Sequence, residues 1–157
     1  MTGNVTPSLV VNANYEYVNA EITKDSDPKN VGLKNFGTPD HVANLWMKYN
    51  LLHHKLKGLS FGMGYQYMGK RSAAWKWEPG DEINYRPVYN LLDAALGYSN
   101  EKFNISLNIY NITNINYATL GYFNSATNEW RYTPGEPVNF RLSVGINLVH
   151  LKKNKNV

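Results

Sequence analysis

The sequence predicts an all-β fold, an antiparallel meander of about six long strands. Three observations support this class. Apolar and polar residues alternate along six segments, the connections between the segments alternate in length, and Tyr and Trp gather near the segment ends. A period of two places successive side chains on opposite faces of a strand, whereas a helix requires a period near 3.6. A helix is an alternative for one stretch, 40–52.

Each expected strand carries an apolar row on one face and a mainly polar row on the other. In the clearest one, 102–110, apolar residues alternate with Asn104, Ser106 and Asn108. The segment 41–51 is the weakest, because Trp46 falls on its polar face. The segments are long for soluble sheets, where the mode is about 5–6 residues, and they approach the ~9–11 residues with which a strand crosses a bilayer. The expected strands span 9–17, 41–51, 59–67, 91–98, 102–110 and 139–148.

The connections between these strands are alternately long and short. The long ones are 23–39, 72–84 and 121–136, and the short ones lie at His53–Lys57 and Ser99–Glu101. Outer-membrane barrels have short periplasmic turns and long external loops, with apolar residues toward lipid and polar residues toward the lumen. Tyr and Trp near strand ends suit the membrane–water interface, although such rings also pack soluble cores. The strands are therefore expected to cross a membrane.

Composition excludes several other classes. The 157 residues contain no Cys, which excludes a disulfide framework. The net charge of +4 is concentrated in the last residues, so the rest of the sequence does not indicate a nucleic-acid-binding surface. No nucleophile or carboxylate pair has a partnered His, so we expect neither an enzyme nor a cofactor site. The adjacent His53 and His54 point apart on an extended chain, so no metal site is expected. No apolar run reaches the ~20 residues of a membrane helix, and no segment has the features of a signal peptide.

Four ordered stretches carry a family resemblance. The first is a strand with a Tyr-x-Tyr pattern in 14–22, and the second is a stretch with spaced Asn, Pro, His, Leu, Trp and Tyr residues in 32–49. The third consists of an Asp and a Tyr in 88–98, followed by Asn residues and a Tyr in 107–117. The fourth is a Pro-Gly-Glu-Pro sequence before the last strand, in 134–140. In this order the chain resembles the C-terminal part of the β-barrel of TonB-dependent outer-membrane receptors, the siderophore class in particular. Two departures are Asn35, four residues before Pro39 instead of two, and Val138, where Arg is usual.

The resemblance implies the last six strands of a 22-stranded barrel whose N-terminal plug engages the TonB complex. Residues 1–149 would form the barrel wall, and 150–157 a basic C-terminal tail. It further implies a Gram-negative outer membrane as location, lipid as surroundings and iron–siderophore import as function, with cobalamin and glycan importers sharing this barrel end. Six strands are too few to close around a polar lumen, because the smallest membrane barrels have ~8 strands. The alternatives are a small autonomous outer-membrane barrel or porin-like protein, and a soluble β-sheet binding module.

Cations and aromatic rings gather in two of the long connections, where they suit an anionic, aromatic metal chelate. An alternative assigns them to an interface girdle that contacts lipopolysaccharide phosphates. The candidate ligand-binding residues are Arg71, Trp75, Trp77, Tyr122, Trp130 and Arg131.

Overall fold

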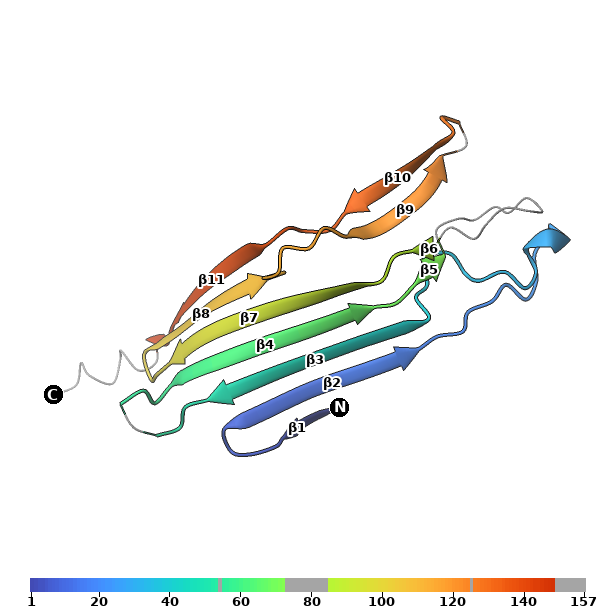
Figure 1. Ribbon diagram of the computed structural model, residues 1–157. Coiled ribbons are helices and arrows are strands. Elements are labelled where there is room, and N and C mark those ends of the chain that lie inside the picture. Colours follow the sequence, from blue (N-terminus) through green and yellow to red (C-terminus); the bar gives the residue numbers. More distant parts are fainter. Residues whose placement is uncertain (54, 73–84, 125, 149–157) are drawn as a thin grey trace.

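The fold is built on one seven-stranded antiparallel sheet (Figure 1). The computed structural model describes residues 1–157 except 54, 73–84, 125 and 149–157, and the side chains of 72, 85, 86, 122 and 123 also lie outside this description. In the sheet the strands follow one another as β1-β2-β3-β4-β7-β8-β11. These strands are β1 (Thr2–Asn4), β2 (Leu9–Tyr17), β3 (His41–Asn50), β4 (Leu59–Met68), β7 (Tyr89–Ser99), β8 (Phe103–Tyr110) and β11 (Asn139–Ile146).

The six expected strands are confirmed as β2, β3, β4, β7, β8 and β11, each antiparallel to the next. The helix alternative for 40–52 is wrong, because β3 occupies that stretch. The expected separation of the connections is also confirmed. The described parts of the turns between β3 and β4 and between β7 and β8 lie at one end of the sheet, and the described parts of the three long connections lie at the other (Figure 1). We call these ends the short-turn end and the long-loop end.

Five short strands were not expected from the sequence. β1 pairs with the first half of β2, so β1 and β11 form the edges of the sheet, whereas the sequence places β2 at an edge. The hairpin of β5 (Arg71–Ser72) and β6 (Tyr85–Arg86) and the hairpin of β9 (Ala118–Asn124) and β10 (Glu129–Pro134) extend the long-loop end (Figure 1). A 3₁₀ turn, η1 (Pro28–Asn30), lies in the connection between β2 and β3, and Asp27 caps it by accepting from the Lys29 N–H.

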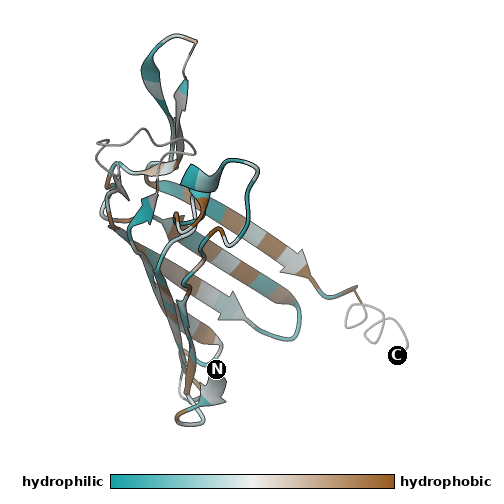
Figure 2. Cartoon of the chain, turned by 90° about the vertical axis from the view of Figure 1, so that its right-hand side faces the viewer, coloured by the Kyte–Doolittle hydropathy of each residue, from teal (hydrophilic) through white to brown (hydrophobic). Residues whose placement is uncertain are grey.

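The strand register places apolar side chains beside apolar side chains across the sheet. The pairing of neighbouring strands aligns Leu9, Tyr49, Phe61, Leu96, Leu107 and Leu142 in one row. The row on either side of it in the same face is equally apolar, for example Met47 beside Met63. Bands of high and low hydropathy alternate along the strands in Figure 2. We call the side of the sheet that carries these apolar rows the apolar face, and the opposite side the polar face.

The apolar face is exposed, because no second layer covers it in the described part of the chain. Leu91, at 8% exposure, is the one described hydrophobic residue that is fully buried, whereas Leu142 is 63% and Phe140 76% exposed. The accessible surface of the chain is 11718 Å², against about 8,000 Å² for a compact monomer of this mass. The described residues therefore form almost no core of their own, and most of the large apolar side chains on this face are exposed.

Aromatic rings mark both ends of the apolar face. At the long-loop end, Tyr15 Oη lies 2.8 Å from His41 Nδ1, and the ring centroids of Tyr17 and His41 are 5.0 Å apart. At the short-turn end Tyr98 and Phe103 are exposed beside the β7–β8 turn. Rings of this kind at the ends of an apolar band fit the two interfaces of a bilayer.

Candidate functional site: the polar face and the long-loop end

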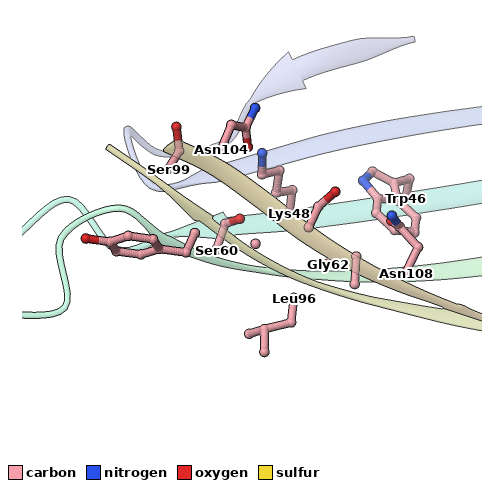
Figure 3. A pocket seen from close by; sticks show the side chains of 12 residues that line it. Trp46, Lys48, Ser60, Gly62, Leu96, Ser99, Asn104 and Asn108 are labelled. Carbon is pink, nitrogen blue, oxygen red and sulfur yellow. The ribbon is translucent and has the colours of Figure 1, made fainter. Parts of the chain in front are cut away.

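The polar face contains a groove around Trp46, the residue that breaks the alternation of its strand. Its indole lies flat over Gly62 and Gly64 of the neighbouring strand, where an added Cβ would come within 2.6 and 2.8 Å of the ring. The two glycines thus make room for the ring, which covers the backbone they leave bare. A cavity of about 250 Å³ lies beside the indole. Figure 3 shows Trp46, Lys48 and Ser60 among the side chains that line it.

Lys48 is the one charged residue that lines this cavity. Apart from Trp46, Leu96 and Tyr98, the other lining residues are small or uncharged polar, and no carboxylate is among them. Within the described part of the chain, the one ion pair is Lys34–Asp40, far away in the connection between β2 and β3. The groove is therefore a mainly polar surface with a single cation, Lys48, as expected for a barrel wall that faces water.

The Trp46 packing leads to a stability prediction. Gly64→Val should lower the free energy of unfolding of the assembled barrel by about 1–3 kcal/mol, because the new side chain would overlap the indole. Gly145→Val on the same face is the control, since its added Cβ meets nothing closer than 3.6 Å. Urea titration in lipid vesicles measures both. Equal midpoints for the two variants would contradict the packing described here.

A buried polar network joins the polar face to the long-loop end. Asp93 accepts from Gln66 Nε2 (3.0 Å) and from the backbone N–H of Asn111 (2.9 Å). Asn111 is 3% exposed and has a left-handed backbone with φ of 49°. Its side chain donates to the carbonyls of Ile115 and Glu136 at 3.0 and 3.1 Å, and its Oδ1 accepts from the Ile115 N–H at 3.1 Å.

These contacts give a structural role to the third stretch of the family resemblance, in which an Asp and a Tyr in 88–98 are followed by Asn residues and a Tyr in 107–117. Asn114, also left-handed, accepts from the Val138 N–H at 3.0 Å. Asn111 and Asn114 thus connect the end of β8 to the segment that enters β11. The Asn111 amide therefore bonds the backbone just beyond the end of β8.

Aromatic rings and an arginine pack just beyond this network. The ring centroids of Tyr89 and Tyr117 are 4.5 Å apart, and the Arg71 guanidinium lies 5.1 Å above the Tyr89 ring. Tyr117 leaves no space for a side chain at Gly135, so the glycine is required for this close approach. Burial raises the pKa of the Tyr117 phenol above its usual value.

Three of the six candidate ligand residues have described side chains, and they differ in exposure. Arg71 is 5% exposed, and it donates from Nη1 to the Thr119 carbonyl (3.2 Å) and from Nη2 to the Ala118 carbonyl (3.1 Å). Its buried Nε has no hydrogen-bond partner among the described residues.

The other two lie on β10. Trp130 is half-buried with its ring 6.3 Å from that of Tyr132, and Arg131 is exposed. The structure brings Arg71 to the base of the β9–β10 hairpin and places Trp130 and Arg131 farther along it. Trp75, Trp77 and the Tyr122 side chain lie outside the described part, so their role stays a prediction.

Metal and catalytic sites were not expected. In the described residues no three His, Cys, Asp or Glu side chains come together as a metal site would require. Among the same residues, no helix has the length and apolar character needed to span a membrane.

Known proteins match this chain over most of its length. It is 29% identical over 147 residues to the metal-pseudopaline receptor CntO of Pseudomonas aeruginosa, which covers 93% of this chain and 19% of the receptor. It is 26% identical over 121 residues to the ferrioxamine B receptor of Salmonella typhimurium, which covers 73% of this chain and 16% of the receptor. The chain thus spans about a fifth or less of the length of these relatives.

Solved structures show the same architecture. The closed form of the ferric-catecholate import receptor Fiu from Escherichia coli K12 aligns with 92% of this chain and 19% of its own, at 28% identity and a TM-score of 0.71. The ferric yersiniabactin uptake receptor FyuA of Yersinia pestis aligns with 92% of this chain and 22% of its own at a TM-score of 0.74, and at 18% identity it shows the fold alone. The family model described as "TonB dependent receptor-like, beta-barrel" matches residues 2–112. The chain therefore belongs to the TonB-dependent receptor β-barrel family.

Proposed function

We propose that this chain is a section of the barrel wall of an outer-membrane receptor that imports iron–siderophore complexes into a Gram-negative bacterium. One observation carries this proposal, the exposed apolar face of a single-layer sheet whose other face is polar. A large exposed apolar surface is unfavourable in water, whereas a barrel places this surface against lipid and turns the polar face toward the lumen. Residues 1–149 are assigned to the wall and 150–157 to a basic tail, which lies outside the described residues.

The proposed ligand is an anionic metal chelate. The similar receptors, named for metal–pseudopaline and ferrioxamine B, support a metal chelate as the ligand. The exposed cation Arg131 on β10 favours an anionic chelate, and the half-buried Trp130 lies next to it in sequence, on the opposite face of the hairpin. A guanidinium binds anionic oxygens, and an indole face packs on the aromatic or apolar parts of a chelate. Trp75, Trp77 and Tyr122 remain candidates for the same site.

The complete receptor is proposed to work as a transporter and not as an enzyme. Its plug domain would receive energy from the inner-membrane TonB complex, and this chain alone is not expected to transport. The wall section alone is also not expected to form a pore. An open sheet leaves unpaired N–H and C=O groups at its edges, and the hydrocarbon of a bilayer offers them no hydrogen bonds.

Uptake of radioactive iron by the complete receptor tests the proposal. We expect accumulation of at least one ferric siderophore from a panel of catecholates, hydroxamates and carboxylates in cells that have TonB, and none in a matched strain lacking it. Labelled cobalamin and a glycan are included as competing ligand classes. An assembled receptor that imports one of these two and no ferric chelate would overturn the siderophore assignment, and uptake independent of TonB would overturn the mechanism.

A further inference from the structure

Three long connections meet at Arg71. Arg71 begins β5, directly beyond β4, and pairs across the β5–β6 hairpin with Arg86. An isolated bridge joins it to Pro39 in the connection between β2 and β3. Its guanidinium reaches the carbonyls of Ala118 and Thr119 at the start of β9. One side chain thus contacts the segment that carries the β9–β10 hairpin, whose place at the long-loop end is seen in Figure 1.

The surroundings of this guanidinium provide hydrogen-bond acceptors and an aromatic face. A buried cation is costly unless its donors are satisfied, and here two successive carbonyls accept from the two Nη atoms and the Tyr89 ring covers the guanidinium, while Nε has no hydrogen-bond partner among the described residues. The two Nη atoms spread over two neighbouring carbonyls, a geometry that the planar fork of arginine provides and a lysine ammonium does not. At 5% exposure the group is turned inward, away from the solvent from which a ligand arrives.

The β9–β10 hairpin depends on contacts at its base. It is a two-stranded sheet separate from the main sheet, and an isolated hairpin of this size is only marginally stable. Besides the two Arg71 bonds, the base is held by the Gly135 N–H donating to the Tyr117 carbonyl (2.8 Å) and by Thr119 Oγ1 donating to the Thr133 carbonyl (3.2 Å). Of these contacts, the Arg71 pair ties the hairpin to a different connection.

We propose that Arg71 is a positioning residue: it anchors the base of the β9–β10 hairpin to the β4–β7 connection and so fixes where Trp130 and Arg131 stand. Arg71 itself does not contact the ligand. The part of this inference that concerns a ligand rests on the proposed function, whereas the anchoring of the hairpin does not.

Hydrogen exchange of the complete receptor, without ligand, tests the anchor. In Arg71→Gln, amides of 118–134 should exchange about tenfold faster, because two charge-assisted bonds that oppose local opening are lost. Peptides from β7 and β8 should be unchanged. Lys70→Gln is the matched control, since it removes a neighbouring exposed cation, and it should leave exchange in 118–134 as in the parent.

Arg71→Lys separates positioning from simple charge. The lysine keeps the charge but loses the fork, so exchange in 118–134 should rise nearly as much as in the glutamine variant. Exchange at the parent rate in Arg71→Gln, or full rescue by lysine, would overturn the proposal. Failure of both variants to assemble would also overturn it, because Arg71 would then support the whole barrel and not one hairpin.

Binding of a ferric chelate, measured on the same variants, reports on the proposed function separately. Arg131→Gln should weaken binding without changing exchange, whereas Arg71→Gln should weaken binding and raise exchange together. Faster exchange in Arg71→Gln with unchanged binding in both variants would leave the anchor in place and overturn the assignment of the hairpin to the ligand.

Discussion

Replacing Leu142 by arginine is expected to lower the amount of folded receptor in the outer membrane far more than replacing its neighbour Ser143. Leu142 is 63% exposed in the middle of β11, and it pairs with Leu107 on the apolar face. Arginine on the lipid side near the bilayer midplane costs about 2–4 kcal/mol. Ser143 is also exposed but lies on the polar face, beside Ser106, where a cation can remain in water.

The two variants differ by one position on one strand, so local strand propensity is closely matched. Folded barrel is measured as the heat-modifiable band on an SDS gel, and its stability by urea titration in vesicles. Equal loss of folded receptor in Leu142→Arg and Ser143→Arg would show that the assignment of the two faces is wrong.

Truncation of Asn111 is expected to cost about 3–5 kcal/mol of folding free energy. Asn111→Ala removes three hydrogen bonds to Ile115 and Glu136 and leaves their partly buried backbone groups without these partners, at up to about 1–3 kcal/mol for each group. It also forces alanine into the left-handed region, at about 1–2 kcal/mol. These costs overlap, so the total is below their sum.

Asn116→Ala is the matched control for this change, because Asn116 is exposed in the same short segment and should be nearly neutral. Thermal unfolding of the refolded barrel compares the two. A melting temperature for Asn111→Ala equal to that of the control would mean that the link between β8 and β11 does not depend on this side chain.

The long strands were predictable because the alternation of apolar and polar residues is a local property of the chain. β2 covers 9–17 as expected, and β8 begins one residue later than expected. β1, at three residues, is too short to show a period, and it forms because β2 offers an edge. The β9–β10 hairpin was missed because it lies within a polar connection and is held by contacts to distant residues.

The site was less predictable than the fold because its roles depend on contacts between connections. The sequence identified Arg71 as a cation near aromatic rings, and the ring contact with Tyr89 exists. Its burial against the β9 carbonyls could not be foreseen, since nothing local relates residue 71 to 118 and 119. Trp46 disturbed the alternation of its strand, and the signal that explains it was present in Gly62 and Gly64, once the register is known.

The central claim, that the apolar face belongs against lipid, is tested most directly by size-exclusion chromatography of the 157-residue chain in plain buffer and in detergent. Its exposed apolar surface extends over several strands, well beyond the ~300–600 Å² patch of a typical soluble monomer, and its edge strands β1 and β11 invite pairing with other chains. We expect aggregation or precipitation in buffer and a dissolved species in detergent. A sharp monomer peak in buffer, with a cooperative thermal transition and no need for detergent, would contradict the account.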